Sequence, residues 1–196
     1  MIDSIDSSHV VLVDMDGVLA DFDLAVVEAL KPTCPDIHVG PSSHRMYLAF
    51  PAYAKQIRAV AGARGFFRDL KPIRDALAGW QLLEELGYRP HICSSPLVWH
   101  PDCEREKRAW LAEHLGEQVA REAYIVRDKC PCPGFALIDD IPSVECASNA
   151  PEWRHIVFDQ TYNRQSQAPY RLHGWLDPNL PDLLIDAQRR HRERNG

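Results

Sequence analysis

The sequence lacks the features that send a protein into or across a membrane. Its first six residues have neither a basic start nor an apolar run, so no signal or transit peptide is visible. No stretch approaches the length of an apolar membrane span. Internal repeats and low-complexity tracts are also missing. These absences argue against a membrane protein or a repeat array, and the cytoplasm is the expected compartment.

Positive charge is scarce as well. The 196 residues carry 22 Lys and Arg against 28 Asp and Glu, which gives a net charge of −6 at pH 7. This balance disfavours a nucleic-acid polymer or an anionic membrane as partner, because both require a broad basic face. A small phosphate pocket is compatible with the same average. With 45% hydrophobic residues, the chain is long enough for one good core, and we expect a small-molecule partner.

The six cysteines do not form a metal-binding pattern. Cys130 and Cys132 are close in sequence, but no second cysteine pair follows at the spacing of a zinc finger. His100 and Cys103 are likewise an isolated pair. Because no export signal is visible, we predict reduced thiols throughout. Residues 130–132 are expected to be a loop with incidental thiols.

Short apolar runs predict the strands and helices. Five runs without polar alternation, typical of strands buried on both faces, lie at residues 10–13, 91–93, 124–126, 135–138 and 155–158. Two helical segments with apolar stripes lie between strands; one carries Trp80 and ends near Gly87, and the other carries Trp110 and ends near Gly116. Both tryptophans are expected in the core. The pattern predicts an α/β fold with a parallel sheet wrapped by helices.

A long insertion separates the first two strands. It exceeds what one crossover helix requires, and it has helical composition at residues 25–30 and 43–61, with an interruption at Pro51. Residues 32–41 form a loop rich in helix breakers. We interpret residues 22–75 as a small helical cap. The core then comprises residues 1–21 and 76–196, and its charged end at 189–194 is expected to be a solvated last helical turn.

An acidic motif follows the first strand. Asp14, Asp16 and Asp21 come directly after the apolar run, and Gly17 allows a sharp turn beneath the first two. Ligands of parallel α/β sheets bind outside the carboxyl ends of the strands, where these carboxylates stand. A turn with an aspartate helix cap would explain one of them. It does not explain a pair, and Asp14 and Asp16 are close enough to share a hard cation.

Three further strand ends carry groups that complement the acidic pair. In chain order they are hydroxyls, a lysine and a second acidic pair, supplied by Ser94 and Ser95, by Lys129, and by Asp139 and Asp140. Taken singly, each group is explained by a helix cap, a surface charge or a turn. Taken together, they predict one site for a phosphate group and a divalent cation.

The order Asp-x-Asp-Gly, Ser, Lys and Asp-Asp resembles that of the haloacid dehalogenase (HAD) superfamily of phosphatases. Within it, the chain from about residue 10 to 163 is similar to the 5′(3′)-deoxyribonucleotidases. The segments that carry this similarity are DMDGVLADF from Asp14, GFF from Gly65, LKPI from Leu70, ICSSP from Ile92, EK from Glu106, HLG from His114, RDK from Arg127 and LIDD from Leu137. The resemblance implies a Rossmann-like three-layer core with a helical cap inserted after the first strand. It also implies magnesium-dependent dephosphorylation of nucleoside monophosphates.

Residue chemistry suggests the catalytic roles at such a site. A carboxylate attacks phosphorus without needing a base, so Asp14 is the candidate nucleophile that forms an aspartyl-phosphate. Asp16 is placed to protonate the leaving oxygen and then to take a proton from water. Lys129 is expected to supply a cation to the phosphate, and Ser94 a hydrogen bond.

Mg²⁺ is the cofactor that the resemblance implies. Its ligands would be the carboxylates of Asp14 and Asp140 and the backbone carbonyl of Asp16. The ion would reduce the repulsion between an anionic nucleophile and an anionic phosphate. Asp139 is expected to be a neighbouring structural carboxylate.

The resemblance also indicates where the nucleoside lies. Phe22 and Phe67 are expected as aromatic walls, and Ser95 and Arg127 as polar contacts. For Phe67, packing between cap and core is an equal alternative. The animal enzymes carry a cap tryptophan shortly before the Phe pair, whereas residues 54–65 hold no aromatic residue here. The candidates to replace it are Tyr47, Phe50 and Tyr53.

Other functions stay open at this point. The same carboxylates would serve a phosphatase for another small phosphomonoester, or a phosphotransferase that passes the group to an alcohol. A signalling receiver domain also combines Asp, Ser or Thr and Lys at parallel strand ends, but the strand ending at Cys93 delivers Ser94 where a receiver has its phosphoacceptor aspartate. A nucleotide-binding protein without turnover is a further alternative. The sequence decides neither the preferred base and sugar nor the oligomeric state, for which a homodimer is one option.

Overall fold

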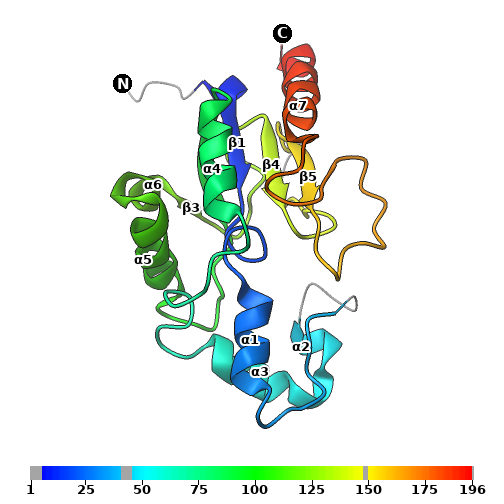
Figure 1. The fold of residues 1–196 in the computed structure, drawn as a ribbon. Coiled ribbons are helices and arrows are strands. Elements are labelled where there is room, and N and C mark those ends of the chain that lie inside the picture. The colour runs from blue at the N-terminus through cyan, green and yellow to red at the C-terminus, as the bar shows by residue number, and fades with distance from the viewer. Residues whose placement is uncertain (1–5, 41–45, 148–149, 196) are drawn as a thin grey trace.

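A six-stranded parallel sheet organises the chain in the computed structural model, which describes residues 6–40, 46–147 and 150–195 (Figure 1). Its strands lie in the order β3-β2-β1-β4-β5-β6, and all neighbouring pairs are parallel. They are β1 (Val10–Val13), β2 (Arg89–Ser94), β3 (Tyr124–Ile125), β4 (Ala136–Asp139), β5 (Arg154–Phe158) and β6 (Arg171–Leu172). The five predicted strands are confirmed. The sixth was missed because Arg171 and Leu172 include only one apolar residue and therefore form no apolar run.

The helices follow the predicted alternation with strands. They are α1 (Phe22–Leu30), α2 (Met46–Ala49), α3 (Ala54–Ala61), α4 (Ala76–Glu85), α5 (Cys103–Leu115), α6 (Glu117–Glu122) and α7 (Leu180–Asn195), with 3₁₀ turns η1 (Ser7–His9) and η2 (Pro51–Tyr53). The charged segment 189–194 ends α7, and within it His191 is buried instead of solvated. The predicted start of helical structure at residue 43 lies outside the described residues. Among the described helices, none combines the length and the apolar character that crossing a bilayer requires.

The central strand shows why its sequence is apolar throughout. Alternate side chains of a strand face opposite sides of the sheet. In β1, Val11 and Val13 pack on one face of the sheet, in a hydrophobic cluster with residues of α4, α5 and α7. Trp80 and Trp110 belong to the same cluster, so both are core residues, as expected. Val10 and Leu12 pack on the opposite face of the sheet, which loops cover as a third layer. The main loop residues of this layer are Cys130, Cys132, Val144, Cys146 and Trp153.

One cysteine pair in this third layer corrects the sequence-based prediction. Cys130 and Cys146, 16 positions apart in the sequence, form a disulfide, so the prediction of reduced thiols throughout is wrong for this pair. The free cysteines of the described chain are all buried: Cys34, Cys93, Cys103 and Cys132. Sequence spacing gives no signal for the pairing, because two loops separated by β4 come together only when the third layer folds.

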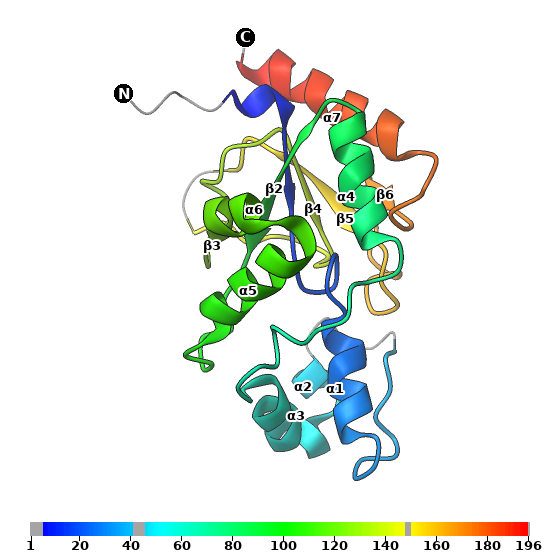
Figure 2. The same ribbon diagram turned by 60° about the vertical axis from the view of Figure 1, so that its left-hand side comes forward.

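Helices α1, α2 and α3 lie together beyond the carboxyl ends of the strands in both views (Figures 1 and 2). They share a small hydrophobic cluster of their own, which includes Val26, Met46 and Ile57. Asp21 starts α1, because its Oδ1 accepts a hydrogen bond from the backbone N–H of Leu24 at 3.1 Å. Of the three aspartates in the acidic motif, Asp21 is therefore the helix cap.

A buried carboxylate of α5 binds the segment that follows α3. Glu106 of α5 accepts hydrogen bonds from the backbone N–H groups of Gly65 at 2.6 Å and Phe67 at 3.2 Å. Nε2 of His100 lies 3.2 Å from the same carboxylate. These contacts hold the N-terminal half of α5, and with it the neighbouring Lys107, at the edge of the sheet where β1 ends.

Candidate active site

The strand register brings the predicted groups to one edge of the sheet. Val13 pairs with Ile92 of β2 and with Ile138 of β4. Asp14, the next residue, is therefore level with the ends of both neighbouring strands. Its backbone N–H donates to the carbonyl of Ile138 at 2.9 Å, which continues the pairing by one residue. Side chains that follow the three central strands consequently meet above the same edge, as the sequence predicted.

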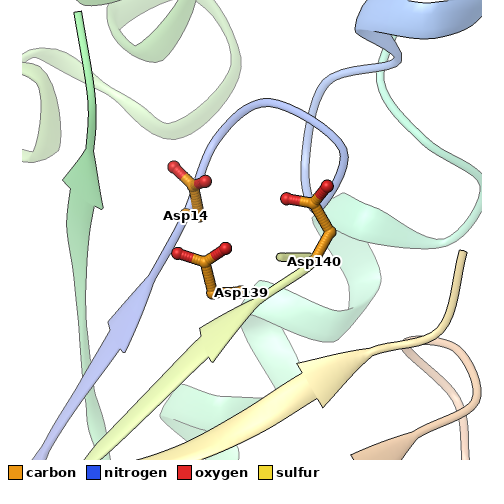
Figure 3. A group of neighbouring side chains, drawn as sticks. All are labelled: Asp14, Asp139 and Asp140. Atoms are coloured by element: carbon orange, nitrogen blue, oxygen red, sulfur yellow. The ribbon is translucent and has the colours of Figure 1, made fainter. Parts of the chain in front are cut away.

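Three carboxylates stand together at this edge. Asp14, Asp139 and Asp140 each place one oxygen within 4.8 Å of the others, and Figure 3 shows them above the ends of β1 and β4. All three are buried. Burial and the charges of Asp139 and Asp14 raise the pKa of Asp140 well above its usual value. Buried carboxylate oxygens that repel one another are a donor set that fits a hard divalent cation.

Lys129 supplies a buried positive charge beside this cluster. Its Nζ lies 3.0 Å from Asp14 Oδ2 and 2.5 Å from Asp139 Oδ2. Burial alone would lower the pKa of Lys129, but the two carboxylates outweigh it and raise that pKa above its usual value. Asp139 also accepts a hydrogen bond from the backbone N–H of Ile141 at 3.0 Å. These contacts support the predicted structural role of Asp139.

The first two aspartates of the acidic motif, Asp14 and Asp16, have pKa values shifted in opposite directions. Burial alone would raise the pKa of Asp14, but Lys129 and Lys107 outweigh it and leave that pKa below its usual value. For Asp16, burial outweighs the opposing charge of Lys107, and its pKa is raised. Asp14 is therefore the ionised carboxylate, and Asp16 retains its proton to higher pH. A pair split in this way provides a nucleophile and an acid side by side.

Lys107 is a site residue to which sequence reasoning assigned no role, although the EK segment that contains it was part of the resemblance. Its side chain is fully buried, and its Nζ lies 2.8 Å from Asp16 Oδ2, 2.8 Å from Ser94 Oγ and 2.7 Å from the carbonyl of Ser95. The search for chemistry at strand ends could not find it, because Lys107 comes from helix α5. A usable signal was present: together with Cys103 and Trp110, it lies on the apolar stripe of that helix.

The turn after β1 requires glycine at position 17, as predicted. Gly17 has a φ of 75°, a conformation that residues with a side chain rarely adopt. A Cβ atom there would lie 2.7 Å from Asp140 Oδ2 and 2.8 Å from Tyr162 Oη. Tyr162 Oη donates a short hydrogen bond to Asp140 Oδ2, and Gln160 Nε2 donates to the Gly17 carbonyl at 2.7 Å. The loop after β5 thus contacts the turn and stabilises it. Nothing in the sequence pattern predicts this contact.

A cavity of about 320 Å³ opens beside the carboxylates. Its walls come from the strand ends and from α1, α2 and α3. The polar and aromatic residues that line it are Asp14, Asp16, Phe22, Asp23, Tyr47, Arg58, Ser95, Trp99, Asp140 and Tyr162. Its size suits a small organic phosphate.

The predicted nucleoside contacts divide into two groups. Phe22 and Ser95 line the cavity. Phe67 has no exposed surface and packs with its ring centre 6.0 Å from that of Phe22 and 5.2 Å from that of Phe66, so the packing alternative is what the structure shows. Arg127 is exposed and is absent from the cavity lining. The structure therefore places neither Phe67 nor Arg127 on the lining of this cavity, and their contact with a nucleoside stays a prediction.

Three further cavity residues were assigned no role from the sequence. Arg58 and Trp99 lie at the end formed by the helices, next to Tyr47, the one candidate of the three replacement aromatics that lines the cavity. Asp23, in the first turn of α1, is half-buried, and burial together with the charges of Asp21 and Asp16 raises its pKa to about 7. Asp23 and Arg58 line the cavity because α1 and α3 pack over the edge of the sheet.

The architecture defines the class of protein. A crystal structure of a HAD family hydrolase from Deinococcus radiodurans, with bound phosphate and sodium, superposes on this chain with a TM-score of 0.56 at 15% identity. The match covers 93% of this chain and 97% of that one. The chain therefore has the α/β fold of the HAD hydrolases, which confirms the predicted fold class.

Sequence comparison identifies the family. A family model described as 5′ nucleotidase, deoxy (pyrimidine), cytosolic type C protein (NT5C) matches residues 8–189. The cytosolic-type 5′(3′)-deoxyribonucleotidase of Homo sapiens is 36% identical over 94% of this chain and 96% of its own length. A relative from Bordetella bronchiseptica is 38% identical over 83% of this chain and 89% of its own length. The chain belongs to the NT5C family of nucleotidases and is a phosphoric monoester hydrolase, which excludes the signalling-receiver alternative.

Proposed function

We propose that this enzyme removes phosphate from nucleoside 5′-monophosphates, deoxy forms included, and from 3′-monophosphates, in a Mg²⁺-dependent reaction through an aspartyl-phosphate. The observation that carries the proposal is an ionised Asp14, 3.0 Å from Lys129, on the wall of a cavity of suitable size. The name of the human relative, 5′(3′)-deoxyribonucleotidase, supports the substrate class. Its description as cytosolic is consistent with the expected cytoplasmic location, which stays a prediction.

In the first step, a carboxylate oxygen of Asp14 attacks phosphorus while the bond from phosphorus to the ester oxygen breaks. The leaving oxygen needs a proton to depart as a neutral alcohol. Asp16 is suited to donate it, because its pKa is raised by burial and because its carboxyl lines the same cavity. The products of this step are the nucleoside and phosphorylated Asp14, with Asp16 as a carboxylate.

In the second step, water attacks the phosphorus of the aspartyl-phosphate. Asp16 takes a proton from that water, and the bond from phosphorus to the Asp14 oxygen breaks. Inorganic phosphate leaves, and both aspartates return to their starting states. Lys107, 2.8 Å from Asp16 Oδ2, holds the side chain in place through both steps and stabilises the carboxylate that forms between them.

The phosphoryl oxygens require donors that are fixed before the reaction begins. Lys129 supplies a charge beside Asp14. Ser94 Oγ accepts its hydrogen bond from Lys107, and its own hydroxyl interacts with Asp14, so it is placed to donate to a phosphoryl oxygen bound beside that carboxylate. The orientation of Ser94 is thus set by Lys107, which explains why a helix residue belongs to a site built on strand ends.

Mg²⁺ would be held by the carboxylates of Asp14 and Asp140 and by the backbone carbonyl of Asp16. Asp139 pairs with Lys129 at 2.5 Å and is absent from the cavity lining, whereas Asp14 and Asp140 both line the cavity, which supports these two carboxylates as the ligands. When bound, the ion offsets the negative charge that accumulates as carboxylate and phosphate approach each other. The buried, mutually repelling state of Asp14 and Asp140 supports this assignment.

We further propose that residues 22–75 act as the cap of the site. Helices α1 and α3 contribute Phe22, Asp23 and Arg58 to the cavity, so a movement of these helices would admit substrate and release product. Closure would exclude water from the reacting groups until the nucleoside has left.

A phosphate-release assay over a substrate panel tests the proposal. With Mg²⁺, we expect release from ribo- and deoxynucleoside 5′-monophosphates, and slower release from sugar phosphates that cannot fill the cavity. Addition of EDTA should reduce the rate at least about 100-fold, because the cation offsets several kcal/mol of charge repulsion. Restoring Mg²⁺ is the control. No release from any nucleotide, or full activity in EDTA, would contradict the proposal. A preference for sugar phosphates would favour a phosphatase of another specificity.

A further inference from the structure

The carboxylate of Asp140 depends on a single hydrogen-bond donor. The other two carboxylates of the cluster, Asp14 and Asp139, each pair with Lys129 and each accept a further hydrogen bond from a backbone N–H group. In the part of the chain that the structure describes, the one hydrogen bond to the Asp140 carboxylate comes from Tyr162, whose hydroxyl donates to Oδ2. Without this hydroxyl, no protein group would hold the carboxylate in its present orientation.

The loop that carries Tyr162 is also attached to the backbone of Asp140. Asn163, the next residue, is buried, and its Nδ2 donates to the carbonyl oxygens of Asp140 and Phe158, both at 2.7 Å. The Oδ1 atom of Asn163 accepts from Arg171 of β6 at 2.8 Å. These bonds fix the loop after β5 against the end of β4. The Tyr162 hydroxyl is therefore positioned by the fold, and it is not placed by the hydrogen bond to Asp140 alone.

The glycine at position 17 leaves room for the hydrogen bond between Tyr162 and Asp140. A Cβ atom built on Gly17 would lie 2.8 Å from Tyr162 Oη and 2.7 Å from Asp140 Oδ2. A side chain there would displace both partners. Tyr162 and Asp140 line the same cavity as Asp14, so the hydrogen bond lies beside the reacting groups.

We propose that Tyr162 is a positioning residue for the metal ion and acts by holding the Asp140 carboxylate in the orientation that binds Mg²⁺. The inference rests on the proposed function, in which Asp140 is a ligand of the ion. A hydrogen-bond partner fixes a ligating group before the ion arrives, and its loss typically weakens metal binding by about 10–100-fold. Tyr162 thus sets the Mg²⁺ concentration that the enzyme requires, and it needs no contact with the substrate to do so.

Tyr162→Phe tests the proposal, because it removes the hydroxyl and keeps the ring. Mn²⁺ is the probe for binding, since the electron paramagnetic resonance signal of the free ion is lost when the ion binds, and added Mg²⁺ then displaces it. We expect Tyr162→Phe to bind both ions about 10-fold more weakly than the wild type. Half-maximal hydrolysis of p-nitrophenyl phosphate should likewise require about 10-fold more Mg²⁺.

The rate at saturating Mg²⁺ distinguishes positioning of the metal from a general structural defect. Once the ion is bound, it holds the Asp140 carboxylate itself, so the saturated rate of Tyr162→Phe should lie within about 3-fold of the wild-type rate. A merely structural defect would lower that rate, and added metal would not restore it.

Tyr170→Phe is the matched control. Tyr170 Oη donates to Asp186 Oδ2 at 2.5 Å, so the same kind of hydrogen bond is removed, but Asp186 belongs to α7 and neither residue lines the cavity. Its affinity for Mn²⁺ and its Mg²⁺ requirement should equal those of the wild type.

Equal Mn²⁺ affinities in the wild type and Tyr162→Phe would overturn the proposal. So would a rate defect in Tyr162→Phe that saturating Mg²⁺ does not relieve. Asp140→Asn distinguishes this failure from failure of the metal assignment, because it should lose the Mn²⁺ binding seen in the wild type. If Asp140→Asn bound Mn²⁺ as the wild type does, the assignment of Asp140 as a ligand would be wrong, and the inference about Tyr162 would fall with it.

Discussion

Asp14→Asn should lower the rate of phosphate release by about 10⁴-fold or more, because the variant lacks the oxygen nucleophile of the first step. Its fold should be retained. Lys129 keeps Asp139 as a partner at 2.5 Å, so the substitution strands no buried cation. We expect the free energy of unfolding to change by less than about 2 kcal/mol. Phosphate release and urea denaturation on the same preparation are the measurements.

Asp21→Asn is the matched control for this variant. It makes the same chemical change seven residues further along, at the cap of α1, where asparagine is as good a capping residue as aspartate. Its activity should stay close to that of the wild type. Comparable activity in Asp14→Asn and Asp21→Asn would show that Asp14 is not the nucleophile.

Lys129→Met should damage both activity and stability. The variant removes the cation that we propose to stabilise the phosphate, and we expect a rate loss of about 10³-fold. It also leaves Asp14 and Asp139 buried without their cation, and breaking a buried pair in this way costs about 3–5 kcal/mol of unfolding free energy. Urea denaturation in EDTA at pH 7 measures the stability without interference from bound metal.

The stability defect of Lys129→Met should depend on pH. Without the lysine, the largest charge that opposes the burial of Asp14 is lost, so the pKa of Asp14 in the folded state rises above its unfolded value. A group with a raised folded pKa contributes stability at low pH that is lost as the pH rises through that pKa. The difference from the wild type should therefore shrink as the pH falls.

A double variant separates the two effects of removing Lys129. Lys129→Met combined with Asp139→Asn removes one of the two stranded charges, so it should regain part of the stability at pH 7 while its activity stays low. A double variant no more stable than Lys129→Met would mean that Asp139 is not paired as the structure shows.

Much of the site was predictable from the sequence because apolar strands determine the register. The apolar run of β1 is buried on both faces, which identifies it as a central strand of a parallel sheet. Strands β2 and β4 pair with it in parallel, so the residues that follow these three strands lie at the same edge. Asp14, Ser94, Lys129 and Asp140 were found by this reasoning. The sharp turn at Gly17 was likewise predicted, because a glycine directly follows Asp14 and Asp16 at the end of the strand.

The missed residues depend on packing between segments far apart in the chain. Lys107 reaches Asp16 from a helix, and strand-end reasoning does not consider helices. Arg58 and Trp99 meet because α3 packs on the loop after β2, a contact with no periodic signature. The same limit explains Phe67, whose motif was recognised but whose burial behind Phe22 and Phe66 was one of two possibilities.

The central claim is that Asp14 becomes covalently phosphorylated. The most direct test is peptide mass spectrometry on acid-quenched Asp16→Asn enzyme after mixing with p-nitrophenyl phosphate and Mg²⁺. The good leaving group needs no acid in the first step, whereas hydrolysis of the intermediate still needs the missing base. We predict a phosphoryl group on the peptide that contains Asp14, and none when Asp14 is also replaced by Asn. Phosphate release without any phosphorylated peptide, or a phosphoryl group elsewhere in the chain, would contradict the account.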